Sequence, residues 1–326
     1  MLQVMGAALV ALVIGTAAGP WYIRWLTRRG IGQNIRDLTP ETHNAKQGTP
    51  TMGGVLILVA ALIPYAVFAT KTVTSLVLFM ITFGSGLIGF ADDFISQWRR
   101  RSLGLKGKTK LLLQLPLTVV AVWLGIKYGA LSTKLYVPFV REGLDIGLFY
   151  YVFAFLLVAG FSNAVNLSDG LDGLAAGTVS VAFVAYAGIA FLQGRPALAI
   201  LAVCLAGASV GFLWYNTHPA SVFMGDTGSL ALGAGLAAVA MATKMEVLLL
   251  LIGGLFVVEA LSVMIQVFSY RVFHRRVFLM APLHHHFELK GWSETKIIVR
   301  FWIVAVILSG AGFALYYLSN TRLPTG

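Results

Sequence analysis

The sequence predicts an all-α integral membrane protein with ten transmembrane helices, and three observations support this prediction. Of its 326 residues, 58% are hydrophobic and only 11% are charged, and the mean hydropathy is +0.83. Such a chain has too little polar side chain to cover a water-soluble protein of this size. Its apolar stretches have the length of a helix that crosses a bilayer, and its basic residues gather in alternate loops.

Ten apolar stretches follow one another along the chain. Their lengths exclude a transmembrane barrel, whose strands are about ten residues long and alternate between polar and apolar side chains. The first stretch has no basic flank and is interpreted as a retained helix rather than a signal peptide. No soluble segment separates the stretches, so residues 1–326 are expected to form a single polytopic membrane domain. The stretches cover residues 2–26, 52–70, 73–91, 111–130, 148–165, 171–192, 197–215, 229–243, 247–270 and 297–318.

The distribution of Lys and Arg predicts the orientation. Most of these residues follow the odd-numbered stretches, in segments 28–46, 99–110 and 271–296. Because basic residues stay on the cytoplasmic side, five loops are expected in the cytoplasm and both termini outside it. The net charge of +11 then lies on one face, where it suits anionic headgroups and phosphorylated substrates. Nucleic acid is not expected as a partner, because these residues lie against the bilayer without a recognition fold.

Two smaller features complete the organisation of the chain. The longest outer connection, residues 131–147, is interpreted either as a small strand pair or as a plain connector. The single cysteine, Cys204, excludes an intrachain disulfide and a cysteine metal site.

The acidic residues number only thirteen, so their positions are informative. Asp92 and Asp93 lie where the third stretch meets the membrane boundary, and carboxylates there are unfavourable unless they have a function. Two adjacent carboxylates repel each other, so one can act as a base or both can share a cation. The alternative is a pair of interfacial anchors balanced by Arg99–Arg101.

Polar residues recur at a spacing of three as the fifth stretch ends. On a continuous helix they would spread over half of the circumference. Gly170 and Gly173 are therefore expected to end the helix and to let all four side chains reach one cavity. A plain loop is the alternative, but it would not need two asparagines inside an apolar stretch. The four residues are Asn163, Asn166, Asp169 and Asp172.

Asp226 stands between two glycines, in the segment between the seventh and eighth stretches. Glycine on both sides lets a ligand approach closely, and Thr227 and Ser229 add hydroxyls. A carboxylate here suits Mg²⁺ held between protein and phosphates, and oxygen ligands favour magnesium or manganese over zinc. An ordinary helix-capping turn is the alternative.

Two further cytoplasmic segments carry polar residues. His284, His285 and His286 are consecutive, so on a helix they cannot all face one metal, but they can donate hydrogen bonds to a phosphate. A zinc site and a plain surface loop are the alternatives. Lys46 and Thr51 precede the second stretch in a glycine-rich segment, which predicts either an anion site at a helix start or a simple N-cap turn.

All five segments fall in loops that the basic residues place in the cytoplasm. Together they offer carboxylates, a hard-metal ligand, cations for phosphates and asparagines for a base or a sugar. This combination fits phosphoryl transfer, in which catalysis depends on positioning and charge neutralisation. We therefore expect an active cleft at the cytoplasmic face.

These segments resemble those of the phospho-N-acetylmuramoyl-pentapeptide transferase family, within the superfamily of polyprenyl-phosphate phospho-sugar transferases. The resemblance extends over nearly the whole chain. The superfamily shares the Asp pair and the Asn/Asp segment, whereas three histidines followed by Phe-Glu-Leu-Lys-Gly-Trp resemble the muramoyl branch. The segments are Lys46–Gly54, Gly89–Asp93, Asn163–Leu174, Phe223–Gly233 and Pro282–Trp292.

The resemblance implies transfer of phospho-MurNAc-pentapeptide from UDP-MurNAc-pentapeptide to undecaprenyl phosphate, giving lipid I and UMP with Mg²⁺ as cofactor. It also implies a homodimer in the bacterial cytoplasmic membrane. Asp92, Asp93 and Asp226 would be catalytic, Asp226 would hold Mg²⁺, and Asp169, Asn216 and Phe223 would shape the uridine pocket. The expected substrate-binding residues are Lys46, Thr51, Lys108, Asn163, Asn166, Asp169, Asp172, Asn216, Phe223, Ser229, His284, His285 and His286.

Some alternatives stay open. The family usually carries lysines where this chain has Ser96 and Arg100. This difference is expected to change the contacts made at these two positions more than the activity. The lipid phosphate attacks directly, with Asp92 as its base, or one Asp of the pair first forms a phospho-enzyme. A related transferase using UDP-GlcNAc is one rival, and an ion-coupled transporter with Glu259 on its path is another.

Overall fold

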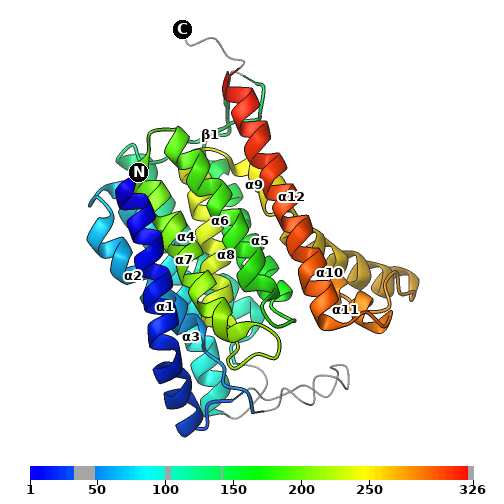
Figure 1. The fold of residues 1–326 in the computed structure, drawn as a ribbon. Coiled ribbons are helices and arrows are strands. Elements are labelled where there is room, and N and C mark those ends of the chain that lie inside the picture. Colours follow the sequence, from blue (N-terminus) through cyan, green and yellow to red (C-terminus); the bar gives the residue numbers. More distant parts are fainter. Residues whose placement is uncertain (33–47, 100–103, 141, 322–326) are drawn as a thin grey trace.

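The computed structural model of the chain describes residues 1–32, 48–99, 104–140 and 142–321, and it shows a bundle of helices with one short pair of strands (Figure 1). The all-helical membrane architecture expected from the sequence is confirmed. The helices are α1 (Leu2–Arg28), α2 (Gly54–Phe68), α3 (Val73–Trp98), α4 (Gly107–Lys127), α5 (Phe149–Ser168), α6 (Leu174–Leu192), α7 (Pro196–Asn216), α8 (Gly225–Thr243), α9 (Glu246–Ile252), α10 (Gly254–Phe273), α11 (Leu283–Leu289) and α12 (Glu294–Thr321).

The predicted apolar stretches correspond to these helices, with three differences. Among the described residues, nine helices are long and apolar enough to cross a membrane. The second stretch forms α2, which has only 15 residues, short of the roughly 20 that a span needs. The ninth stretch is not one helix, because Gly253 separates α9 from α10. The third continues to Trp98, so the Asp pair lies inside α3 rather than at its end.

Helix α8 forms the centre of the bundle, since 89% of its apolar window is buried. Small residues let neighbouring helices approach its backbone. A Cβ on Gly233 would lie 2.2 Å from the carbonyl oxygen of Phe161 on α5. Contacts through small residues are typical of helices that pack within a membrane. Helices α1, α4 and α10 have only 28% of their windows buried, so they lie at the surface of the bundle.

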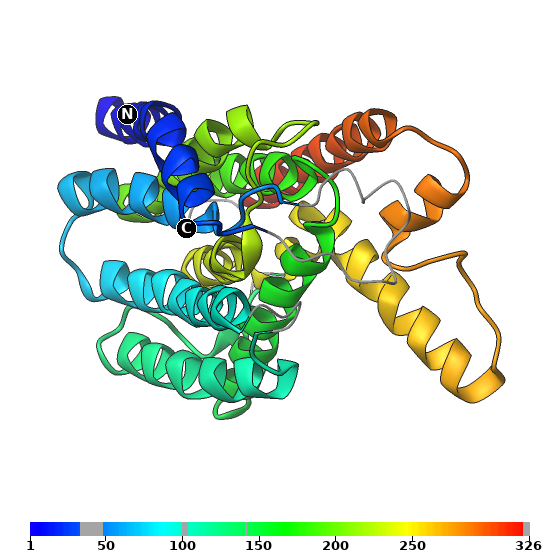
Figure 2. The same ribbon diagram turned by 90° about the horizontal axis from the view of Figure 1, so that it is seen from below.

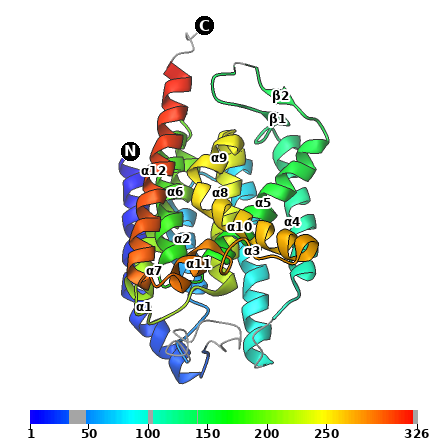
Figure 3. The ribbon, with the colours of Figure 1, turned by 90° about the vertical axis from the view of Figure 1, so that its right-hand side faces the viewer.

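One end of the bundle holds the start of α1 and the end of α12 (Figures 1 and 3). Here β1 (Lys134–Leu135) pairs antiparallel with β2 (Leu144–Asp145), so the strand-pair interpretation of the outer connection is confirmed. A buried ion pair lies at the same end, where the Lys244 ammonium donates to Glu246 at 2.8 Å and to the Tyr150 hydroxyl at 3.0 Å. The opposite end holds the end of α3 and the starts of α4 and α8.

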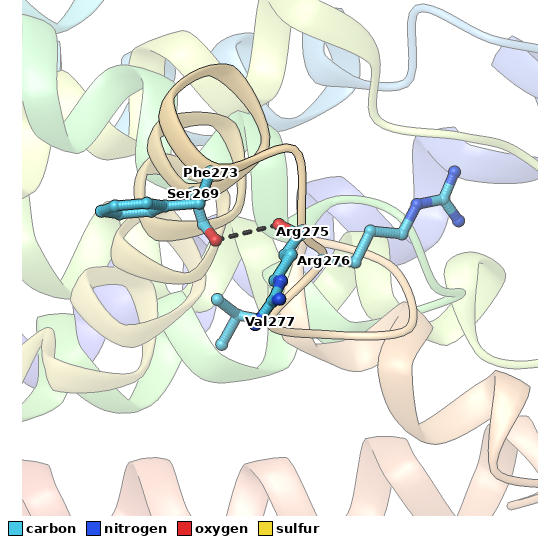
Figure 4. A pocket seen from close by; sticks show the side chains of 5 residues that line it. All are labelled: Ser269, Phe273, Arg275, Arg276 and Val277. Atoms are coloured by element: carbon cyan, nitrogen blue, oxygen red, sulfur yellow. Dashed lines mark hydrogen bonds between the residues drawn. The ribbon is translucent and has the colours of Figure 1, made fainter.

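Helix α10 extends away from the bundle, and the chain then returns through α11 to α12 (Figures 1 and 2). The Ser269 hydroxyl donates to the carbonyl oxygen of Arg275 at 2.9 Å and holds the following loop against the tip of α10. An open hollow at this tip (Figure 4) is lined by Ser269, Phe273, Arg275, Arg276 and Val277. It lies apart from the acidic residues of α3 and α8.

Candidate active site

Three carboxylates from two helices meet between the C-terminal part of α3 and the first turn of α8. Asp92 and Asp93 belong to α3, and Asp226 lies in the first turn of α8. One oxygen atom of each lies within 4.8 Å of the others. Glycine permits this approach, because a Cβ on Gly89 would lie 2.2 Å from the carbonyl oxygen of Asp226. The two acidic motifs of the sequence therefore form a single cluster.

Lys110 on α4 lies between two of these carboxylates. Its ammonium forms one ion pair with Asp92, at 3.0 Å, and a second with Asp226. Asp92 also accepts a hydrogen bond from the backbone N–H of Leu105 at 2.6 Å. The positive charge offsets the repulsion between the carboxylates. Lys110 is the lysine that contacts the cluster, whereas Lys108 is exposed and its substrate-binding role stays a prediction.

Asp93 differs from its neighbours, because the protein already uses both of its oxygens. Oδ1 accepts a hydrogen bond from the N–H of Asp226 at 3.0 Å, and Oδ2 accepts from the N–H (2.9 Å) and the hydroxyl (2.6 Å) of Thr227. A carboxylate satisfies the free N–H groups of a helix start and interacts favourably with the helix dipole. Gly225 makes room, since its φ is +73° and a Cβ there would lie 2.7 Å from Asp93 Oδ2. Asp93 therefore holds the start of α8, and with it Asp226.

Asn166 connects α5 to the cluster. Its amide donates to Asp226 Oδ1 and to Ser229 Oγ, each at 2.8 Å. Asn163, one turn earlier, is exposed and donates to the carbonyl oxygen of Ala159 in its own helix at 2.7 Å. Of the two asparagines in this stretch, Asn166 is the one that contacts the carboxylates.

The turn from Asp169 to Gly173 ends α5 and begins α6, as the two glycines predict. Asp169 is the C-cap of α5 and is half-buried. Asp172 belongs to a second group, in which its carboxylate lies 3.0 Å from His218 Nδ1, and His218 lies 3.3 Å from Glu294. The chain reversal directs Asp172 toward the start of α12. Asn166 and Asp172 therefore belong to two different groups of polar side chains, and the expectation that all four residues face one cavity stays a prediction.

Asn216 supports the loop between α7 and α8. Its side-chain oxygen accepts a hydrogen bond from the N–H of Gly173 at 3.0 Å, and its amide nitrogen donates to the carbonyl oxygen of Val222 at 2.9 Å. The buried side chain thus joins this loop to the turn that begins α6. These two hydrogen bonds fix the loop between α7 and α8 against the start of α6.

The start of α2 is joined to the start of α8. The backbone N–H groups of Gly53 and Gly54 donate to the carbonyl oxygens of Phe223 (2.8 Å) and Met224 (2.7 Å). Thr51, shortly before them, is buried. These two amides are therefore not free to form the anion site that the sequence predicts at this helix start. They hold the segment that leads into α8.

The three histidines lie on α11, a helix of seven residues. His284 is fully buried, and its Nδ1 lies 3.2 Å from Oε2 of Glu259 on α10. His286 Nδ1 accepts a hydrogen bond from a backbone N–H of the preceding loop at 3.1 Å, and His285 lies between the two. Partial burial and the charge of Lys290 lower the pKa of the His286 imidazole, in keeping with an accepting nitrogen. Consecutive helical residues point about 100° apart, so the three rings face different partners.

Comparisons with known proteins identify the family of this chain. Residues 75–244 match the family model of glycosyl transferase family 4, and residues 46–58 match phospho-N-acetylmuramoyl-pentapeptide-transferase signature 1. The chain is 47% identical over 315 residues to the phospho-N-acetylmuramoyl-pentapeptide-transferase of a Geobacillus species, covering 95% of this chain and 97% of that protein. The chain belongs to the phospho-N-acetylmuramoyl-pentapeptide transferase family.

Two further relatives carry the same name. The phospho-N-acetylmuramoyl-pentapeptide-transferase of Rubrobacter xylanophilus is 46% identical over 321 residues, covering 96% of this chain and 97% of that protein. That of Anoxybacillus flavithermus is 45% identical over 307 residues, covering 93% and 94%. The similarity therefore extends well beyond the site to nearly all of the bundle.

The two family matches, to residues 46–58 and to residues 75–244, each include only some of the predicted site residues. The signature includes Lys46, which lies outside the described residues, and Thr51. The family 4 match includes the carboxylates but ends before the histidines of α11. Helix α11 lies against the turn between α5 and α6, because His284 Nε2 faces Gly170 so closely that a Cβ there would lie 2.4 Å from it.

Sequence reasoning missed Lys110, the partners of Asp172 and the contact between Glu259 and His284. A signal for Lys110 exists in α4. Gln114 and Thr118 follow it at a spacing of four, and both are buried. Residues at this spacing share one face of a helix, so Lys110 lies on the face that packs against the bundle.

Proposed function

We propose that this chain transfers phospho-MurNAc-pentapeptide from UDP-MurNAc-pentapeptide to undecaprenyl phosphate, giving lipid I and UMP. The observation that carries the proposal is the cluster of Asp92, Asp226 and Lys110 in a chain of this family. Such a cluster suits a diphosphate, because the ammonium and a cation on the carboxylates would both counter phosphate charge. A transporter is not favoured, since Glu259, the acid expected on its path, is engaged with His284.

Mg²⁺ is the cation that we infer for this cluster. The ligand atoms on offer are carboxylate oxygens of Asp92, Asp93 and Asp226, and such hard donors suit magnesium better than zinc. Because Asp93 already accepts three hydrogen bonds from the protein, Asp92 and Asp226 would supply the ligands. The bound ion would neutralise charge on the diphosphate of the donor.

The residues of the chain act in this scheme by positioning the reactants. A lipid phosphate oxygen forms a bond to the phosphorus that carries the sugar, the bond from that phosphorus to the UMP oxygen breaks, and UMP leaves with the electron pair. Lys110 would hold phosphate oxygens, and Asp92 beside it would orient the lipid phosphate and accept its proton. The other residues proposed to bind substrate are Lys46, Thr51, Lys108, Asn163, Asn166, Asp169, Asp172, Asn216, Phe223, Ser229, His285 and His286.

A two-step route uses the same residues. In this route Asp92 attacks first and carries the phospho-sugar until the lipid phosphate takes it. A covalent phospho-sugar trapped on the protein when the donor is supplied without lipid acceptor would establish the two-step route. If no such adduct forms without acceptor, while the same protein releases UMP rapidly once the acceptor is added, the direct route is favoured.

The membrane arrangement belongs to the same proposal. We infer ten transmembrane helices in a single domain of residues 1–326, with α2 as one short span and α9 together with α10 as another. Basic segments flank the end that holds the carboxylates, so this end would face the cytoplasm and both termini would lie outside it, in the bacterial inner membrane. A homodimer is proposed from the family resemblance.

UMP release by the purified protein tests the proposed function. With UDP-MurNAc-pentapeptide, undecaprenyl phosphate and Mg²⁺ we expect UMP, with EDTA none, and with excess Mg²⁺ added back a full recovery. Release from UDP-GlcNAc instead would identify a related transferase. Folded protein that releases UMP from neither donor would contradict the proposal.

Lys110→Met is expected to lower the rate of UMP release by about 100-fold, because it removes the charge shared between Asp92 and Asp226. Lys127→Met is the matched control. It removes the same charge from an exposed position in the last turn of the same helix and should stay within about threefold of the wild type. Equal losses in both variants would show that the lower rate does not come from the ion pairs of Lys110.

A further inference from the structure

Glu259 and His284 form a buried pair between α10 and α11. Neither side chain has exposed surface, and His284 Nδ1 lies 3.2 Å from Glu259 Oε2. The same oxygen accepts a hydrogen bond from the backbone N–H of Leu283 at 2.8 Å. A carboxylate this far from water is unfavourable unless it is paired or hydrogen-bonded. The two contacts therefore constrain strongly where α11 lies.

Helix α11 needs such an anchor. It has seven residues, too few for a helix that is stable by itself, and the first N–H groups of any helix lack partners inside it. Glu259 accepts the N–H of Leu283, the first residue of α11, and its negative charge is favourable at a helix start. The short helix is thus fastened to α10 at its beginning.

His284 extends the connection to a third segment. Its Nε2 faces Gly170, in the turn between α5 and α6, where a Cβ would lie 2.4 Å from the ring nitrogen. This nitrogen has no hydrogen-bond partner among the described residues. Because His284 points inward, His285 and His286 point about 100° and 200° away from it around the helix. Both of these are partly exposed.

We propose that Glu259 is a positioning residue of the active site. It fixes α11 through Leu283 and His284, so that His285 and His286 alone are presented to the phosphorylated donor. His284 is then a buried link rather than the substrate ligand that the sequence predicts. This inference rests on the proposed function, in which α11 contacts the nucleotide sugar.

Two pairs of variants separate the hydrogen bonds from packing. Glu259→Gln keeps an oxygen that accepts both bonds, whereas Glu259→Met has a similar shape without an acceptor. His284→Asn keeps an N–H donor at the place of Nδ1, whereas His284→Gln moves it to the place of Nε2. We expect Glu259→Met and His284→Gln to lower kcat/KM for UDP-MurNAc-pentapeptide by about 10- to 100-fold. Glu259→Gln and His284→Asn should stay within about threefold of the wild type.

Hydrogen–deuterium exchange of residues 283–289 gives a readout that does not depend on activity. We expect faster exchange in Glu259→Met and His284→Gln, because the start of α11 loses its anchor. Glu246→Met is the matched control. It removes another buried carboxylate, paired with Lys244 at the opposite end of the bundle, and should change neither the exchange of α11 nor kcat/KM per folded protein.

Wild-type exchange and kcat/KM in Glu259→Met would overturn the inference. The inference would also be overturned if His284→Gln kept the wild-type kcat/KM while His284→Asn lost it. The hydrogen bond that matters would then come from Nε2 of His284 and not from Nδ1. A wild-type protein that releases no UMP would refute the proposed function instead. In that case the exchange of α11 would still decide whether Glu259 holds this helix.

Discussion

Asp226→Asn is expected to lower the rate of UMP release by about 1000-fold or more. The change keeps the size of the side chain and an oxygen that accepts the 2.8 Å hydrogen bond from Asn166. It removes the charge that pairs with Lys110 and that would bind Mg²⁺. A thousandfold loss corresponds to about 4 kcal/mol of transition-state stabilisation, the size expected when a metal ligand and an ion-pair partner are lost together. The measurement is the initial rate of UMP release over a range of Mg²⁺ concentrations.

Asp145→Asn provides the control for this substitution. Asp145 is an exposed carboxylate of β2 at the opposite end of the bundle, so the same change there should leave the rate as in the wild type. Excess Mg²⁺ should not restore Asp226→Asn, and binding of Mn²⁺, followed by its paramagnetic signal, should be lost. A variant that keeps more than about a tenth of the rate would show that Asp226 is not the metal ligand.

Most of the fold could be predicted from hydropathy, because each apolar stretch is long enough to require a helix in lipid. The exceptions depend on distant contacts. Gly253 breaks the ninth stretch although its neighbours are apolar, and it packs where a Cβ would lie 2.6 Å from the Phe161 ring. Helix α3 continues past Asp92 and Asp93 because α4 and α8 supply their partners. A short stretch of sequence does not show these contacts, because the partner residues lie on other helices.

The site could be predicted as a set of segments but not as a geometry. The scarcity of acidic residues singled out Asp226, yet its contact with Lys110 depends on how α4 packs. Lys108 and Lys110 differ by about 200° around the helix, so the sequence alone does not show which of the two lysines faces the carboxylates. The three histidines are equivalent in the sequence. Only the position of Glu259 on another helix determines that His284 is the buried one.

Gly89→Ala is expected to damage the protein severely although it adds a single methyl group. The new Cβ would lie 2.2 Å from the carbonyl oxygen of Asp226 and 2.7 Å from the nitrogen of Thr227. Both are backbone atoms, so no rotamer change relieves the overlap, and α3 and α8 must move apart. The hydrogen bonds of Asp93 to Asp226 and Thr227 would stretch with them. We expect a loss of about 3 kcal/mol in the free energy of unfolding, seen as a lower thermal midpoint in mild detergent, and little UMP release from the folded fraction.

Gly160→Ala is the matched control, because it adds the same methyl group to a glycine inside helix α5 where nothing lies within 4 Å of the new Cβ. Alanine also has the higher helix propensity, so this variant should be as stable as the wild type, or slightly more stable, and fully active. If Gly89→Ala behaves like Gly160→Ala, the approach of α3 to α8 is not tight enough for the Asp93 carboxylate to hold the first turn of α8. Asp93 would then be free to act as a second metal ligand beside Asp226, and its positioning role would have to be abandoned.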